Sequence, residues 1–213
     1  MNIAVLAQHE KQKELETRLQ GFPATLCFAD SLEDLLSCTA DVYFDLDFKM
    51  EKERIDALSG FLPKPVFIDS VAYTLKDIGK DFVRINGWNT FFENKISEIV
   101  IPNQEMQKSV LAFLESASWS YQIVPDVPGM ISARIISMII NEAYFTAEAG
   151  VGTKEDIDIA MTLGTNYPYG PFAWGEKIGL KKIYELLVAL NKQDKAYVIS
   201  EMLQDEALKN DRS

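Results

Sequence analysis

Histidine is almost absent from this sequence, since His9 is the only one in 213 residues. Any mechanism that needs a histidine base must therefore use a residue at the start of the chain. The two cysteines, Cys27 and Cys38, lie in apolar surroundings and lack the spacing of metal ligands. We expect both to be buried, reduced thiols rather than a disulfide or a zinc site.

Long hydrophobic runs are also missing. No stretch of about 18 apolar residues occurs, so we expect no membrane span. The first residues lack a basic segment followed by an apolar one, so we expect no signal peptide. Basic residues are outnumbered, at 21 against 32 acidic residues, for a formal charge of -11. Such a surface would repel nucleic acid and anionic lipid. We expect a cytoplasmic protein that binds neither nucleic acid nor membrane.

Short apolar runs alternate with amphipathic stretches up to about residue 124. This alternation is typical of βαβ units and predicts a mostly parallel sheet. Strands are expected at 3–7, 25–29, 41–46, 65–69, 82–86, 97–101 and 120–124, and helices at 11–19, 31–37, 50–60 and 103–118. Ser31 and Asp34 form a plausible N-cap pair, and Gly60 lies where a helix should end.

Pro125, Pro128 and Gly129 interrupt this pattern, and the chain after them is helical in type. Helices are expected at 131–150, at 153–164 with Thr153 as cap and Asp156 in the first turn, at 179–192 and at 195–209, with a loop at 165–175. We therefore expect an α/β domain, 1–125, and a helical domain, 126–213. A helical domain this small does not easily bury several apolar stripes alone, so we expect it to pair with a second copy.

The helical half contains PGMISARIISMIINEAYFTAEAGVGTKEDIDIAMTLGTNYPYGPF. This stretch resembles the 3-hydroxyacyl-CoA dehydrogenases, whose pattern is PGF-x-x-NR, then NEA, EDID-x-A and G-x-P-x-GPF. The positions that agree are Arg134, Asn141, Glu142, Ala143, Asp156, Ile157, Asp158, Gly164, Pro168, Gly170, Pro171 and Phe172. Helix caps, a rigid Pro-Gly loop and helix packing account for most of them without a substrate, so they indicate kinship rather than activity.

The resemblance covers nearly the whole chain. It implies a Rossmann-like α/β parallel-sheet domain followed by an all-α dimerisation domain, hence a homodimer. It also implies NAD-dependent oxidation of 3-hydroxyacyl-CoA in fatty-acid metabolism, with NAD as cofactor and an acyl-CoA or related small molecule as ligand. We expect no metal.

The catalytic segment of the family departs here from its pattern. INGWNTFFENKISEIVI, 85–101, resembles HFFNP and its continuation. The match puts Asn86 at the position of the catalytic histidine and Glu98 at the position of the glutamate that orients it. Asn89 keeps the asparagine of FFNP. A neutral amide such as Asn86 has no usable proton affinity near neutral pH, so the usual base is missing.

The substrate positions also differ. VFIDSVAYTLKDI, 66–78, resembles the family's SNTSSL-x-I segment, and the ungapped match puts Val71 and Ala72 at its two serines, which Ser70 or Thr74 could replace after a small shift. Ala133 stands where an asparagine normally precedes Arg134. The substrate residues that the resemblance implies are Ser70, Asn89, Ala133 and Arg134.

The first turn lacks the glycines that a dinucleotide needs. The family's G-x-G-x-x-G falls on residues 7–12, AQHEKQ. His9 and Gln12 add bulk where the backbone must approach phosphate, and Glu10 adds negative charge at a helix start. We expect His9 to be exposed or next to the helix cap, and Lys11 to lie on a solvated helix face.

A ribose carboxylate is the remaining cofactor group. Asp30 ends a strand, but 25–46 resembles the third strand and its sequel rather than the second, which indicates that about one βα unit is deleted. The cofactor positions by resemblance are therefore Ala7, His9, Gln12 and Asp30.

Three functions remain open. The favoured hypothesis is a divergent 3-hydroxyacyl-CoA dehydrogenase relative whose catalysis is lost or strongly altered. The alternative is a non-catalytic dimeric protein that binds acyl-CoA or a small molecule as a regulator. Two-domain reductases of the pyrroline-5-carboxylate reductase and 6-phosphogluconate dehydrogenase types rank lower, because the NEA, EDID and GPF signals point to the first family.

Overall fold

The computed structural model describes residues 1–209, which divide into two compact units between Met130 and Ile131. The first unit contains one seven-stranded sheet in the order β2-β1-β3-β4-β5-β6-β7. Its neighbouring strands run parallel, except for the antiparallel pair β5 and β6. The strands are β1 (Asn2–Leu6), β2 (Thr25–Ala29), β3 (Val42–Asp45), β4 (Val66–Asp69), β5 (Val83–Ile85), β6 (Ser97–Val100) and β7 (Tyr121–Ile123).

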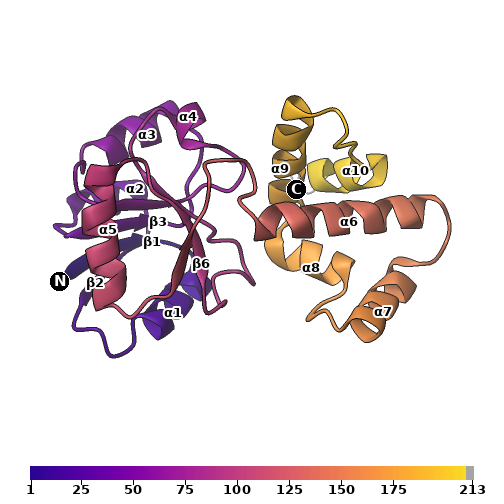
Figure 1. Ribbon diagram of the computed structural model, residues 1–213, viewed down its shortest axis with the longest axis horizontal. Coiled ribbons are helices and arrows are strands. Elements are labelled where there is room, and N and C mark those ends of the chain that lie inside the picture. The colour runs from indigo at the N-terminus through magenta and orange to yellow at the C-terminus, as the bar shows by residue number, and fades with distance from the viewer. Residues whose placement is uncertain (210–213) are drawn as a thin grey trace. The chain divides into compact units, whose positions relative to one another are not determined.

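Helices cover both faces of this sheet (Figure 1), which makes the unit Rossmann-like as predicted. One face packs on α1 (His9–Arg18) and α5 (Gln104–Ser116), and the other on α2 (Leu32–Ser37), α3 (Lys52–Ser59) and α4 (Leu75–Ile78). Adjacent residues of β3 show the two-residue period: Phe44 joins the core under α5, and Tyr43 joins the core under α3.

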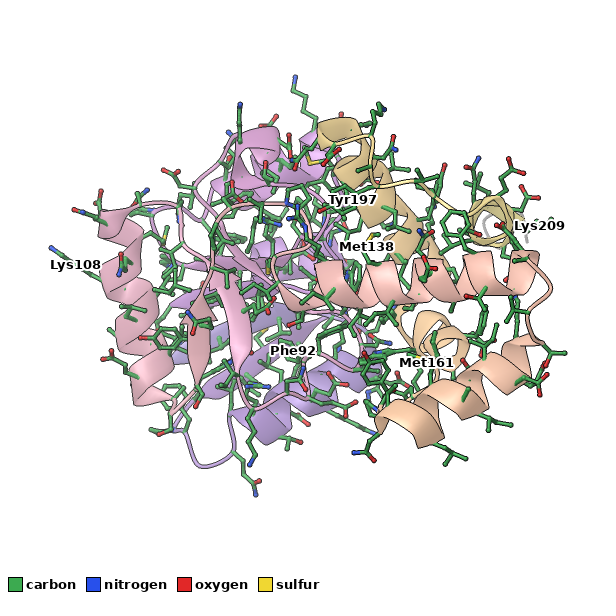
Figure 2. All side chains as sticks on the ribbon, turned by 45° about the vertical axis from the view of Figure 1, so that its right-hand side comes forward. Phe92, Lys108, Met138, Met161, Tyr197 and Lys209 are labelled. Carbon is green, nitrogen blue, oxygen red and sulfur yellow. A yellow bond between two sulfur atoms is a disulfide. The ribbon has the colours of Figure 1, made fainter. Side chains whose placement is uncertain are left out.

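The amphipathic pattern of α5 explains its position. Met106, Val110 and Phe113 recur at helical spacing and are buried against the sheet. Lys108 projects from the opposite side of the helix (Figure 2). The predicted caps are confirmed in this unit, since the Ser31 side chain accepts a hydrogen bond from the Asp34 N–H at 3.1 Å and Gly60 ends α3.

The strand order corrects one sequence prediction. Residues 25–29, which resembled a third strand, pair with β1 from Asn2↔Thr25 to Leu6↔Ala29. They therefore take the place of the second strand in a six-stranded dinucleotide-binding sheet, which has the order 3-2-1-4-5-6. The outermost strand of that order has no counterpart here, so Asp30 follows the strand next to β1.

The cysteine prediction is also wrong. Cys27 and Cys38 form a disulfide, and Cys27 is exposed while Cys38 is half-buried. The reason is that β2 is an edge strand, so its side chains are only partly covered, and the end of α2 brings Cys38 back beside it.

The second unit is wholly helical within the described residues. It contains α6 (Ser132–Glu148), α7 (Lys154–Thr165), α8 (Pro171–Ile178), α9 (Leu180–Gln193) and α10 (Glu201–Lys209). The predicted cap of α7 is confirmed as a capping box between Thr153 and Asp156. None of the helices formed by residues 1–209 is long and apolar enough to cross a membrane.

Two boundaries in this unit differ from prediction. The stretch 165–175 was expected to be a loop, but Pro171 begins α8. Proline suits the first position of a helix, because its φ is preset and its missing N–H has no helical acceptor there. The last helix begins at Glu201 rather than at residue 195.

Candidate functional site

Asn86 and Glu98 lie opposite each other at the end of the β5–β6 pair. Ile85 pairs with Ile99 across these antiparallel strands, so the next residues, Asn86 and Glu98, also face each other. The Asn86 N–H donates to the Glu98 carbonyl at 3.2 Å. The Asn86 side chain is buried and its Oδ1 accepts from the Trp88 N–H at 3.3 Å. The two positions are thus brought together, and the Asn86 side-chain amide is bonded to its own loop.

The turn between β1 and α1 closes on its own atoms. Gln12 Nε2 donates to the Ala7 carbonyl at 2.8 Å. His9 begins α1 and is exposed, as expected, and Glu10 lies in the first turn of the helix. A pyrophosphate at this turn would meet the Gln12 side chain and a carboxylate, whereas it needs close backbone and positive charge. The residues present therefore do not fit a dinucleotide bound in the usual way.

Lys11 corrects another prediction, because its side chain is 2% exposed rather than solvated. It is four residues before buried Leu15 and shares the inward face of α1 with it. Lys11 Nζ donates to the carbonyl of Leu46, just after β3, and to Asp69 Oδ2, at the end of β4, each at 2.8 Å.

A second buried ion pair lies at the end of β3. Asp45 is fully buried, and Arg54 donates to both of its oxygens, from Nε at 2.6 Å and from Nη2 at 2.5 Å. Burial raises the pKa of Asp45, although the bonds from Arg54 oppose that shift. The sequence did signal these groups, since YFD and FID each end a buried strand in an aspartate, a position that faces the ligand side of such a sheet.

Arg84 organises the segment that contains Ser70. Its fully buried guanidinium donates to the Ser70 carbonyl at 2.8 Å, to the Val71 carbonyl at 3.0 Å and to Asp126 Oδ1 at 2.5 Å. Burial lowers the pKa of Arg84. Ser70 is itself 2% exposed and its hydroxyl donates to the Tyr73 carbonyl at 3.0 Å. The Ser70 hydroxyl is thus part of a local hydrogen-bond network.

The other proposed site residues are placed separately. Asp30 is exposed directly after β2, and Asn89 is half-buried in the turn after β5. In the helical unit, Ala133 is fully buried in α6. Next to it, Arg134 has a buried Nε without a hydrogen-bond partner among residues 1–209, and its guanidinium carbon lies 5.7 Å from the centre of the Tyr197 ring.

The motif residues of the helical unit have structural roles. Asp158 accepts from the N–H groups of Phe172, at 2.8 Å, and Ala173, at 3.0 Å, and so caps the start of α8. A Cβ at Gly170 would overlap the Asp158 side chain. Asn141 joins α6 to the start of α10, donating to the Val198 carbonyl at 2.9 Å and accepting from the Ser200 N–H at 3.0 Å.

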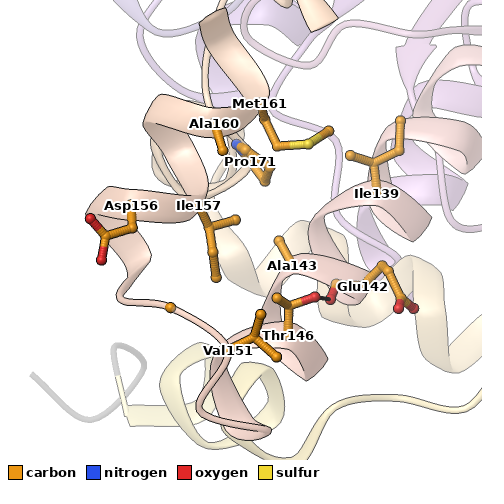
Figure 3. A pocket seen from close by; sticks show the side chains of 11 residues that line it. Ile139, Glu142, Ala143, Thr146, Val151, Asp156, Ile157, Ala160, Met161 and Pro171 are labelled. Atoms are coloured by element: carbon orange, nitrogen blue, oxygen red, sulfur yellow. Dashed lines mark hydrogen bonds between the residues drawn. The ribbon is translucent and has the colours of Figure 1, made fainter. Parts of the chain in front are cut away.

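An apolar groove of about 460 Å³ lies among α6, α7 and the start of α8 (Figure 3). Helix α7 contains no fully buried residue, and its apolar side chains are half-buried, as at Ile157 and Met161, or exposed, as at Ile159 and Leu163. The groove is lined by Ile139, Glu142, Ala143, Thr146, Val151, Gly152, Asp156, Ile157, Ala160, Met161 and Pro171. Thr146 donates to the Glu142 carbonyl at 2.9 Å, which leaves the floor of the groove mainly aliphatic.

Comparison with known proteins assigns the helical unit. Residues 129–212 match the family model described as 3-hydroxyacyl-CoA dehydrogenase, C-terminal domain. This unit is therefore similar to the C-terminal domain of the 3-hydroxyacyl-CoA dehydrogenases. Over 88 residues the chain is 43% identical to 3-hydroxyadipyl-CoA dehydrogenase of Escherichia coli K12, which covers 41% of this chain and 18% of that protein. Over 89 residues it is 35% identical to a probable 3-hydroxybutyryl-CoA dehydrogenase of Bacillus subtilis, covering 42% of this chain and 31% of that protein.

These matches span about a third or less of each of those relatives. Solved structures extend the likeness of fold to the whole chain. The (S)-3-hydroxybutyryl-CoA dehydrogenase of Ralstonia eutropha superposes with a TM-score of 0.75 over 98% of this chain and 94% of its own, at 15% sequence identity. The 3-hydroxybutyryl-CoA dehydrogenase of Escherichia coli K12 is 30% identical, with a TM-score of 0.59 over 67% of this chain and 31% of its own. The match to the family model therefore lies almost wholly in the helical unit, and the likeness over the whole chain is one of fold.

Metal ligation finds no support in the part of the chain that the structure describes. Among residues 1–209, no three His, Cys, Asp or Glu side chains are grouped so that they could hold a metal ion.

Proposed function

We propose that this protein is a 3-hydroxyacyl-CoA dehydrogenase relative that no longer carries out NAD-dependent turnover and works as a dimeric binding protein. The observation that carries the proposal is Asn86, an amide opposite Glu98 at the position where the family has its histidine. An amide cannot take the hydroxyl proton as hydride leaves the same carbon. The turn between β1 and α1 supports the same conclusion, because the Gln12 side chain bonds to its backbone and Glu10 adds negative charge where the family binds the dinucleotide phosphates.

A turnover assay tests this proposal. The purified protein is mixed with NADH and acetoacetyl-CoA, and the loss of NADH absorbance is followed beside an active family member. We expect a rate equal to that without protein, for the wild type and for Asn86→His, since the variant restores the base but leaves the first turn closed. NADH oxidation by the wild type above background would contradict the proposal.

The dimer is proposed to form through the helical unit. Helix α7 presents apolar groups on two sides, since Ala160 and Met161 line the groove while Leu163 is 81% exposed elsewhere on the helix. Val151, at the edge of the groove, is 76% exposed. Exposed apolar side chains that gather around one groove in this way are typical of a protein interface.

Sedimentation velocity measures the state of association. We expect a dimer for the wild type and dissociation for Ala160→Glu, which places a charge in the groove. The matched control is Lys108→Glu on the outer side of α5, which should stay dimeric. A wild-type monomer at tens of micromolar protein would refute this part of the proposal.

The ligand proposed for the helical unit is an acyl-CoA or a related anion. Arg134 supports this idea, because it carries a positive charge and its buried Nε has no hydrogen-bond partner within residues 1–209. Calorimetric titration with acetoacetyl-CoA should give saturable binding to the wild type that is roughly tenfold weaker in Arg134→Met. Equal affinities would remove Arg134 from the site.

A further inference from the structure

Lys11 is a charged residue in a place where charge is costly. Its side chain and that of Asp69 are 2% and 3% exposed, and Nζ lies 2.8 Å from Asp69 Oδ2. Lysine is almost never buried to this degree unless it is paired, and two desolvated charges require good geometry and further hydrogen bonds. The Leu46 carbonyl, also 2.8 Å from Nζ, supplies such a bond. The pair is therefore a built element of the fold.

The location of this pair matters more than its strength. The chain passes from β1 outward to β2 and then back across β1 to β3, so the direction of winding reverses between β1 and β3. In open α/β sheets, ligands bind outside the carboxyl ends of the strands at this reversal. Lys11 extends from the first turn of α1. Its Nζ donates hydrogen bonds to the Leu46 carbonyl, just after β3, and to Asp69, at the end of β4.

Asp69 is held from its other side as well. Its Oδ1 accepts from the Gly87 N–H, after β5, at 3.0 Å. A Cβ at position 87 would lie 2.9 Å from Asp69 Cγ, so glycine is needed for this approach. The carboxylate thus ties α1, β4 and the segment after β5 together at one edge of the sheet.

We propose that Lys11 and Asp69 form an internal lock that takes the place of a bound dinucleotide at the carboxyl edge of the sheet. The Asp69 carboxylate already pairs with the Lys11 ammonium from within the chain, in the place of a phosphate, and the Gln12 side chain bonds to the backbone beside it. The absence of glycines from the first turn and the burial of Lys11 are then explained together. At the carboxyl edge of the sheet, an internal ion pair takes the place of a ligand site.

The lock is tested without reference to turnover. In native protein treated with a lysine-acylating reagent, peptide mass spectrometry compares Lys11 with Lys13, which is exposed on the same helix. We expect Lys11 to react roughly tenfold more slowly or less, because its reaction requires local opening. The rate at Lys11 should not change when millimolar ADP-ribose is added. Equal reactivity of the two lysines, or a change at Lys11 with ADP-ribose, would overturn the lock.

Variants provide the second arm. Lys11→Met leaves Asp69 charged and buried, and we expect its Tm to fall by roughly 10 °C, while Lys13→Met changes it by about 1 °C or less. If Lys11→Met does not fold, the double variant Lys11→Met/Asp69→Leu decides, because removing both charges should restore folding and most of the lost Tm. A double variant no more stable than Lys11→Met would contradict the proposal. If the wild type oxidises NADH while Lys11 stays protected from acylation, the proposed loss of activity is refuted. The buried ion pair would then stand, but it would not occupy the position of the dinucleotide.

Discussion

The two units of this protein differ in how closely their residues agree with the family's sequence pattern. In the helical unit, Asn141, Asp158 and Gly170 match the family pattern: Asn141 and Asp158 hydrogen-bond to backbone of another segment, and Gly170 leaves room for the Asp158 side chain. In the α/β unit, residues 7–12 contain no glycine and Asn86 lies opposite Glu98, while Lys11 forms a buried ion pair with Asp69 and the buried Arg84 guanidinium pairs with the more exposed Asp126. The match to the family model, residues 129–212, accordingly covers nearly the whole helical unit.

The difference between the units shows which motif residues have a structural role that does not depend on catalysis. A residue that caps a helix or joins two helices remains useful without a substrate. A glycine that only lets a phosphate approach has no such second role, so another side chain can fill its space. Preserved motifs in one unit are therefore weak evidence for activity in the other.

The largest expected effect concerns Gly170. The Cβ of Gly170→Ala would overlap Asp158 and displace the cap of α8. We expect a loss of roughly 2–4 kcal/mol in the free energy of unfolding, measured by urea denaturation. Gly164→Ala is the matched control, because position 164 is helical and open, and it should gain up to about 1 kcal/mol. Similar values for the two variants would show that Gly170 is not kept for the cap.

The first two residues of the NEA motif differ in burial: Asn141 is buried and Glu142 is exposed. Asn141→Leu leaves the Val198 carbonyl and the Ser200 N–H without their partner. We expect the free energy of unfolding to fall by about 2–3 kcal/mol. Glu142→Gln, on the exposed side of the same turn, should change it by about 0.5 kcal/mol or less. Equal effects in thermal melting would contradict this division.

The capping boxes allow a smaller test in each unit. Thr74 caps α4 in the α/β unit, and Thr153 caps α7 in the helical unit, each with an aspartate three residues later. Both Thr→Ala changes should cost about 1 kcal/mol. Hydrogen exchange should locate the first loss at α4 and the second at α7. If either change weakens protection in both units equally, the units do not respond separately.

Most of the fold followed from local pattern. The buried strands and the caps at Ser31 and Thr153 depend on residues close in sequence, so periodicity and cap chemistry were enough to predict them. Helix α8 was missed because proline and glycine were treated as loop residues, although proline also begins helices.

The site was less predictable, because it depends on contacts between distant residues. Lys11 is 58 positions from Asp69, and Arg84 is 42 from Asp126. A charged residue in an amphipathic helix is usually solvated, and only the depth of α1 against the sheet reverses that expectation for Lys11. The juxtaposition of Asn86 with Glu98 was implied by family resemblance, but the deletion could be placed only once β2 was paired with β1.

The smallest effect is a dependence of stability on pH from the contact between α10 and its neighbours. Burial raises the pKa of Glu206, but hydrogen bonds from Lys154 and Tyr144 outweigh it, so the net pKa is below the ordinary value of 4.5. Because the folded pKa is the lower one, this contribution is present above pH 4.5 and is lost as the pH falls through the folded pKa. Thermal melting from pH 6 to pH 3 should therefore show a shallower acid decline for Glu206→Gln than for the wild type. Glu155→Gln, an exposed change in α7, is the control and should follow the wild type. If the Tm of all three proteins falls in parallel, the Glu206 carboxylate does not stabilise the packing of α10 on its neighbours.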